Sequence, residues 1–217
     1  MTDRQIASVE ECVQQSLAYL GSAKALESLQ RDPYWPKWDS PWWHMTLLWE
    51  MGLAQRIPPA IADGMCRALG AHYIQNFPLT ASELPAGVDA RRGVLCHCAV
   101  GTIHKVLTAC GVAVEAKLPW LKRWLLRYQQ PDGGLNCEPS AYSGSRKSSM
   151  LSTLPALEAV LHGAPTLSPA EEAFVDRGAQ YLIAHKLIRA TSGDVIDTEW
   201  LKLCFPRFYE YDLLRGL

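Results

Sequence analysis

Histidine and cysteine stand at two places in this 217-residue sequence where they could take part in chemistry. The first is His44, within the run WWHMTLLW. An acid–base group that titrates near neutral pH, beside Trp42 and Trp43, suits a site for aromatic or cationic ligands. The alternative is that His44 is a hydrogen-bonded core residue, as many single histidines on apolar helices are.

The second place is Cys96-His97-Cys98, which looks like a metal-binding cluster. Residues i and i+2 of a helix point to different faces, so one helix could not direct both sulfur atoms to one ion. His97 and His104 share a face but lie two turns apart, too far for one ion without a ligand from elsewhere. We therefore expect no metal ion and no other cofactor.

Carboxylates and tyrosines form a third group of candidates. Asp39 precedes a helix start and could either cap that helix or act in catalysis. Asp132 lies in the turn PDGGL, where we expect it to bind backbone amides. Near the end of the chain, Tyr209, Tyr211 and Asp212 could stabilise a cation or pack a terminal helix.

Helices must position these side chains, because apolar residues recur at helical spacing and no stretch shows the alternation of a strand. Ser40-Pro41 and Ser168-Pro169 each place a hydroxyl N-cap before proline at the first helical position. The expected helices are 5–30, 41–51, 58–76, 92–110, 117–129, 148–162, a helix from 169 to about 185, 198–204 and the C-terminal stretch FYEYDLLRGL.

The helices alternate in character. Those that end near Gly52, Gly111 and Gly163 are apolar nearly all round, as buried helices are, and amphipathic helices follow them. The three glycines are 59 and 52 residues apart. A period in the fifties indicates helical-hairpin repeats. Such pairs stack into an arc or ring, with apolar helices inside and amphipathic helices outside.

This pattern resembles the (α/α) toroid of squalene and terpenoid cyclases and of protein prenyltransferase β-subunits. Arg177-Gly178-Ala179-Gln180-Tyr181-Leu182 matches the first half of the cyclase repeat motif, basic–Gly–x–x–aromatic–aliphatic. Trp124-Leu125, Gln129 and Gly133-Gly134-Leu135 resemble its second half. The sequence PDGGL, a polar loop and then KSSMLSTLPALEAVL is similar to the turn that leads into an inner helix. The resemblance covers residues 39–217.

The resemblance implies an all-α fold: one domain over 1–217, with a leading helix at 5–30 and hairpin repeats over 39–217 that form a partial toroid. Its functional motifs differ. The cyclase acid motif Asp-x-Asp-Asp is absent, and Lys147-Ser148-Ser149 stands where prenyltransferases place a zinc-binding Asp-x-Cys pair. Three repeats and part of a fourth make about half a ring, so an open arc or a ring completed by a homo-oligomer is implied.

In such a ring, the loops and first turns of the inner helices line one mouth of a central cavity. The resemblance therefore implies a protein that binds or transforms an apolar, isoprenoid-like or aromatic small molecule, and whether it is an enzyme stays open. The implied catalytic residues are His44, Asp39, Asp212 and Tyr209. The implied substrate-binding residues are Trp42, Trp43, His97, Arg146, Lys147 and Ser148.

Two other functions stay open. One is a non-enzymatic interaction module that binds a protein segment on the concave surface of the helices. The other is a metal-dependent enzyme that uses His44, His97 and a carboxylate.

Composition argues against several further classes. The formal net charge is -1, which argues against a nucleic acid held by bulk charge. No apolar run reaches the roughly 18 residues that a bilayer span requires. The first residues lack the apolar core of a signal peptide. The seven cysteines lack the spacing of a disulfide framework, so we expect reduced thiols in a cytoplasmic protein.

Overall fold

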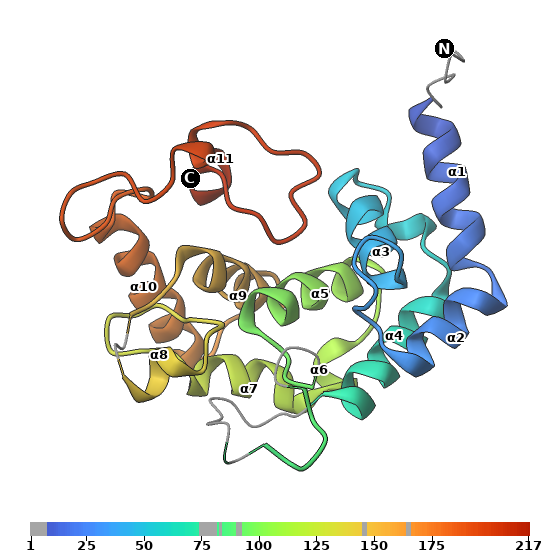
Figure 1. Ribbon diagram of the computed structural model, residues 1–217, viewed down its shortest axis with the longest axis horizontal. Helices are drawn as coiled ribbons and strands as arrows, with labels where there is room; N and C mark the ends of the chain where they lie inside the picture. Colours follow the sequence, from blue (N-terminus) through green and yellow to red (C-terminus); the bar gives the residue numbers. More distant parts are fainter. Residues whose placement is uncertain (1–7, 74–81, 83, 90–92, 145–146, 164–165) are drawn as a thin grey trace.

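The computed structural model describes the whole chain except residues 1–7, 74–81, 83, 90–92, 145–146 and 164–165, and the described part consists of helices joined by turns and irregular segments (Figure 1). The α-helices are α1 (Val9–Leu20), α2 (Ala23–Arg31), α3 (Pro41–Glu50), α4 (Pro59–His72), α5 (His97–Ala109), α6 (Val114–Lys117), α7 (Pro119–Arg127), α8 (Ser140–Ser143), α9 (Met150–Gly163), α10 (Pro169–Ala184) and α11 (Leu213–Gly216). Two 3-10 helices, η1 (Ala54–Arg56) and η2 (Thr198–Leu201), complete the described elements. The all-α fold class is confirmed.

None of the described helices is both long and apolar enough to cross a bilayer. In the same part of the chain, β-structure is limited to two isolated antiparallel bridges, Leu135 with Ser149 and Arg189 with Val195. The first bridge lies between the PDGGL turn and the start of α9.

Several helix boundaries differ from those expected. The leading helix is two helices, because the chain leaves α1 at Gly21 and Ser22 caps α2 by accepting a hydrogen bond from the Ala25 amide. The helix expected from residue 92 begins only at His97, and its N-cap is extended. The C-terminal helix is one short element, α11, after a largely irregular segment.

The three apolar helices follow one another across the molecule in the order α3, α5, α9, with α10 beyond α9 (Figure 1). The closest pair is α5 and α9. Gly101 allows this approach, because a Cβ there would lie 2.8 Å from the Ala156 amide nitrogen and closer still to the Pro155 carbonyl. Two apolar helices that are distant in the sequence are therefore in close backbone contact within the core.

The other helices pack beside this row. Helices α2 and α4 contact each other and α3, while α7 and α10 contact each other and α9. Gly178 of α10 lies against Leu157 of α9, where a Cβ would come within 2.8 Å of Leu157 Cδ1. This glycine belongs to the Arg177–Leu182 motif, so the motif has a packing role at the α9–α10 contact.

The C-terminal segment links helices from opposite ends of the row. Glu50 at the end of α3 accepts hydrogen bonds from the backbone amides of Arg207 (2.6 Å) and Phe208 (2.5 Å). Tyr211 Oη donates to the Leu187 carbonyl just beyond α10 at 2.7 Å. Figure 1 shows this red segment lying along one side of α5 and α9.

Candidate functional site

A cavity of about 470 Å³ lies between the linker after α2, the start of α5 and the loop before α8. Its described lining is aromatic and aliphatic, with two charged side chains and two thiols. The lining residues are Tyr34, Trp35, Lys37, Tyr73, Val94, Leu95, Cys96, Ala99, Cys137, Glu138 and Pro139. A volume of this size is in the range of small-molecule sites, which are mostly apolar with a few polar groups.

An aromatic cluster adjoins this cavity. The ring centroid of Trp43 lies 4.5 Å from that of Trp38, 5.3 Å from Phe208 and 6.0 Å from Tyr209. Lys37 Nζ lies 4.7 Å from the Tyr209 ring centroid, within the range of a cation–π contact. The C-terminal segment therefore supplies two of the rings of this cluster, Phe208 and Tyr209.

The predicted ligand-binding tryptophans lie in the core. Trp42 and Trp43 are each 2% exposed. Both line a small void of about 10 Å³, together with Tyr209. Tyr34, which also lines the large cavity, accepts a hydrogen bond on its carbonyl from Trp43 Nε1 at 2.9 Å. The structure thus brings Trp43 and Tyr209 together, next to the large cavity.

His44 lies on another side of α3 and faces α1. Its Nδ1 is 3.1 Å from Ser16 Oγ, and its ring centroid is 4.6 Å from that of Tyr19. Burial lowers the pKa of His44 below its ordinary value. Asp39 is exposed, and the N-cap of α3 is Ser40, so Asp39 does not cap that helix. Catalytic roles for His44 and Asp39 stay predictions.

Asp212 is 1% exposed and caps α11 by accepting a hydrogen bond from the Arg215 amide at 2.8 Å. Its other oxygen lies 3.5 Å from Arg207 Nε. The C-terminal residues were expected either to stabilise a cation or to pack a terminal helix, and these contacts show the second. A catalytic role for Asp212 stays a prediction.

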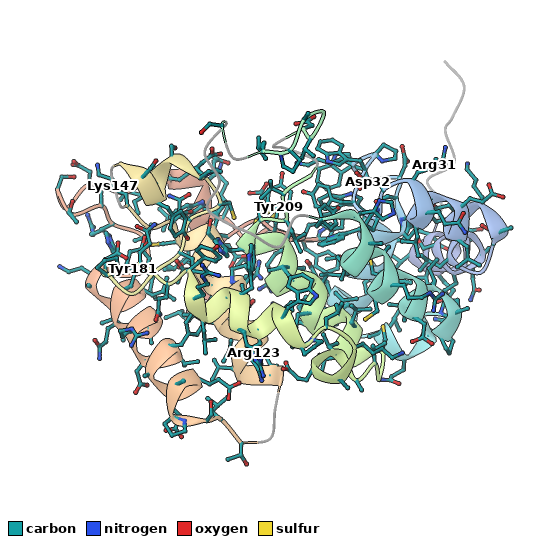
Figure 2. All side chains as sticks on the ribbon, turned by 90° about the horizontal axis from the view of Figure 1, so that it is seen from below. Arg31, Asp32, Arg123, Lys147, Tyr181 and Tyr209 are labelled. Atoms are coloured by element: carbon teal, nitrogen blue, oxygen red, sulfur yellow. The ribbon has the colours of Figure 1, made fainter. Side chains whose placement is uncertain are left out.

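The residues expected before α9 are tied to the PDGGL turn. Ser148 Oγ donates to Asp132 Oδ1 at 2.6 Å, and the Gly134 amide donates to the same oxygen at 3.1 Å. This confirms that Asp132 binds backbone amides. Lys147 is exposed and lies well away from Tyr209 in Figure 2. Arg146 lies outside the described residues.

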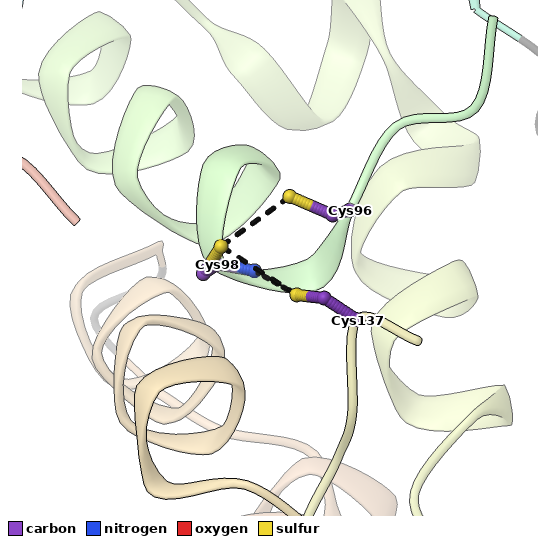
Figure 3. Close-up of side chains that lie close together, drawn as sticks. All are labelled: Cys96, Cys98 and Cys137. Atoms are coloured by element: carbon purple, nitrogen blue, oxygen red, sulfur yellow. Dashed lines mark hydrogen bonds between the residues drawn. The ribbon is translucent and has the colours of Figure 1, made fainter. Parts of the chain in front are cut away.

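Three cysteine side chains converge at one edge of the large cavity (Figure 3). The Sγ atoms of Cys96 and Cys98 are 3.3 Å apart, and those of Cys98 and Cys137 are 3.5 Å apart. The expectation that Cys96 and Cys98 diverge was wrong. Cys96 is the N-cap of α5, with φ −90° and ψ 156°, so the helical angle between i and i+2 does not apply.

The surroundings of Cys137 favour its thiolate. Ser152 Oγ donates to its sulfur at 3.1 Å and the Cys98 amide does so at 3.4 Å. Hydrogen bonds from the Cys96 and Cys98 thiols, with His97 nearby, lower the pKa of Cys137 well below its ordinary value. Hydrogen bonding with the Cys137 and Cys96 side chains, together with burial, raises the pKa of Cys98.

His97, the first residue of α5, is buried beside the thiols. Its Nδ1 is 2.7 Å from the Asn136 carbonyl, and its ring stacks on Trp124 with centroids 4.6 Å apart. These contacts differ from those of His44, which reaches α1. The two histidines, which were expected to act together in a metal-dependent enzyme, thus contact different parts of the molecule.

Within the described ranges, one set of three or more His, Cys, Asp or Glu residues has ligand atoms close enough for a single metal ion, and it is Cys96, Cys98 and Cys137. Reasoning from sequence named the first two and missed Cys137, which lies 39 residues further along than Cys98. Cys137 lies two residues after the PDGGL turn, and nothing in its local sequence indicates that it meets the start of α5.

A buried charge cluster joins α5, α9 and α11. Lys105 forms an ion pair with Glu158, and Arg215 Nη2 lies 2.8 Å from the same carboxylate. Burial lowers the pKa of Lys105 to about 8, against the attraction of Glu158. Burial raises the pKa of Glu158, but the Arg215 hydrogen bond and the two cations outweigh this and hold it below its ordinary value. One carboxylate therefore serves two buried cations.

The sequence matches no family model, no curated protein and no solved structure. The case for a function therefore depends on the residues and their geometry, and the all-helical fold is the part of the family resemblance that the structure supports.

Proposed function

We propose that the protein binds an apolar or aromatic small molecule in the cavity of about 470 Å³. The observation that carries the proposal is the aromatic lining by Tyr34, Trp35 and Tyr73 beside the buried Trp43 cluster. In this proposal α3, α5 and α9 are the inner helices of a partial (α/α) toroid like those of terpenoid cyclases and prenyltransferases.

The lining suggests a ligand with an apolar body and one polar end. Apolar ligand surface that is buried against this aromatic lining contributes roughly 25 cal/mol per Å² to the free energy of binding. Lys37 and Glu138 are the charged members of the described lining, and they would orient a polar group. An isoprenoid or aromatic compound with an anionic end fits this arrangement, because Lys37 already lies against aromatic rings.

Whether the ligand is transformed is a further step of the proposal. Tyr209 is the predicted catalytic residue nearest to the cavity lining, since its hydroxyl is 3.4 Å from Lys37 Nζ. His44, Asp39 and Asp212 contact other parts of the molecule, so an enzymatic reaction would begin with Tyr209 and Lys37 rather than with them.

Ligand binding can be tested by thermal shift with a panel of isoprenoid alcohols, isoprenoid diphosphates and aromatic acids, and by native mass spectrometry of the purified protein. A ligand that raises the melting temperature should lose its effect in Trp35→Ala, whose side chain lines the cavity. Trp120→Ala is the matched control, because Trp120 is a half-buried tryptophan outside the lining. A panel without any shift, or an equal loss in both variants, would contradict the proposal.

A second candidate, a protein-interaction module, is favoured by exposed apolar side chains near the C-terminus. Leu201, Leu203 and Phe205 are 58%, 78% and 65% exposed. Exposed apolar side chains mark an interface when they form one patch. If it joins two copies of this chain, light scattering should give a dimer mass that Leu203→Asp reduces to the monomer. A monomer at all concentrations would exclude self-association.

A further inference from the structure

The three cysteines of the converging cluster come from two separate segments. Cys96 and Cys98 flank the first residue of α5, and Cys137 belongs to the loop after the PDGGL turn. All three sulfur atoms lie within 4.8 Å of one another (Figure 3). Chance proximity of two thiols within a C-x-C sequence is common, but the third sulfur comes from a different part of the fold.

The sulfur spacing fits one ion. Zinc binds thiolate sulfur at about 2.3 Å in tetrahedral geometry, which places neighbouring sulfur atoms about 3.8 Å apart. The two measured separations, 3.3 Å and 3.5 Å, are slightly shorter. Small rotations of the side chains would therefore open a position at equal distance from all three.

The backbone around the thiols is already fixed. The Cys137 amide donates to Ser152 Oγ at 3.0 Å, and the Asn136 amide donates to Tyr142 Oη at 3.0 Å. The Leu135 amide donates to Thr153 Oγ1 at 2.9 Å. These bonds attach the loop to α9 and α8, so binding an ion would need little ordering of the chain, which reduces its entropic cost.

The polar groups nearby suit thiolates. The Cys98 amide and Ser152 Oγ both donate to Cys137 Sγ. Cys96 and Cys98 lie at the N-terminus of the 13-residue helix α5, where the peptide dipoles favour negative charge. Donors of this kind around coordinating atoms orient the ligands and tune the ion.

We propose that Cys96, Cys98 and Cys137 bind one thiophilic metal ion, Zn²⁺ in the first instance, and that its fourth coordination position is open to the adjoining cavity. Cys96 and Cys137 line that cavity, so an exchangeable ligand can reach the ion from it. Three protein ligands with one open position is the coordination of zinc sites that act on a bound molecule. The metal site goes beyond the proposed ligand function and does not depend on it.

The first test uses the purified full-length chain under reducing conditions. We expect elemental analysis after Zn²⁺ loading and desalting to give one ion per chain, and Co²⁺ to give a thiolate-to-cobalt charge-transfer absorption in the near ultraviolet. Cys98→Ser and Cys137→Ser should each weaken Zn²⁺ affinity at least tenfold, measured by competition with a chromophoric chelator, because each removes one of three thiolates.

Cys110→Ser is the matched control. Cys110 is also half-buried but donates to the Ala54 carbonyl, away from the cluster. It should keep the affinity of the wild-type protein. Circular dichroism of every variant separates loss of the ion from loss of the fold, and Cys137→Asp provides a second variant that keeps an anionic ligand. If folded Cys137→Ser binds Zn²⁺ as tightly as the wild-type protein, the assignment of Cys137 is overturned.

The open position has its own readout. Imidazole or a small thiol added to the Co²⁺-loaded protein should change its visible absorption, because it takes the fourth position. An unchanged spectrum would refute the open position. Absence of stoichiometric Zn²⁺ or Co²⁺ binding in the reduced, folded protein would refute the site. So would a disulfide among the three cysteines that persists under reductant.

Discussion

At the scale of single residues, the close contact of α5 with α9 depends on the absence of a side chain at Gly101. Gly101 lies where α5 meets the backbone of α9 at Pro155 and Ala156. Backbone atoms cannot rotate away as a flexible side chain can, so an added methyl group must separate the two helices. The fit between them is therefore more sensitive to added volume than an average core position.

We predict that Gly101→Ala lowers the free energy of unfolding by about 1–3 kcal/mol through overpacking. Gly70→Ala is the control, because Gly70 is exposed on α4 and its added Cβ would be 3.8 Å from Leu118 Cδ2, the nearest atom beyond the local backbone of its own helix. That change should stabilise by up to about 1 kcal/mol through helix propensity. Urea denaturation of the two variants measures both effects. Equal stability of Gly101→Ala and the wild-type protein would mean that α5 and α9 are further apart than described.

The candidate site shows which residue contacts the sequence could predict. The turn at Asp132 was predictable, because an Asx side chain before two glycines has a local use, and Gly133 has the expected positive φ of 92°. The meeting of Cys137 with Cys98 was not predictable, since it depends on how α5 and α9 pack. The orientation of His44 toward α1 could not be predicted either. Helix α3 is apolar on nearly every face, so its sequence does not indicate which side meets which neighbour.

At the scale of elements, the apolar helices were predictable because their composition and their terminating signals agree. Gly52 and Gly111 follow α3 and α5 with φ of 73° and 81°, as glycines after a helix commonly do. The failures are at boundaries. The interruption at Gly21-Ser22 was missed because apolar spacing continues across it. The late start of α5 was missed because residues 93–96 are as apolar as the helix that follows them. That second error hid the position of Cys96 as N-cap.

The charge cluster of α5, α9 and α11 predicts how stability changes with pH. The pKa of Lys105 is about 8 in the folded protein and 10.5 ordinarily. Between these values the unfolded chain binds more protons than the folded protein, so stability rises with pH across this window. Below pH 8 both states are protonated and the cost of the buried charge is present in full.

We expect the wild-type protein to gain about 2 kcal/mol relative to Lys105→Met between pH 7.5 and pH 9.5. The comparison with Lys105→Met removes the contributions of tyrosines and cysteines that titrate in the same range. Chemical denaturation at the two pH values measures it. A constant difference between the two proteins would show that Lys105 keeps its ordinary pKa despite its burial.

At the scale of the whole molecule, the C-terminal segment connects helices that the row α3, α5, α9 keeps apart. It contacts α3 through Glu50, α9 through Glu158 and the end of α10 through Leu187. It also brings Phe208 and Tyr209 to the tryptophans beside the cavity. The integrity of that aromatic cluster thus depends on a segment with little regular secondary structure.

Glu50 is the residue that should control release of this segment. Its carboxylate accepts two backbone hydrogen bonds, from Arg207 and Phe208, and hydrogen bonds to a charged group contribute about 1.5–3 kcal/mol each. Glu50→Ala removes both acceptors, so the segment should open more often without global unfolding. Since 1.4 kcal/mol is a factor of ten, the loss of both bonds, about 3 kcal/mol or more, should raise the open population by about a hundredfold or more.

Limited trypsin digestion provides the measurement, because Arg207 lies within the segment. Cleavage after Arg207 in Glu50→Ala should be about a hundredfold faster than in the wild-type protein, as expected when proteolysis follows the population of the open form. Cleavage after Arg189 serves as the internal control, since that residue is exposed and bonded to Gly193 rather than to Glu50. If both sites accelerate together, Glu50 stabilises the molecule as a whole. If neither does, the segment is held by its aromatic contacts with Trp43 and Trp38, and the carboxylate contributes little to its docking.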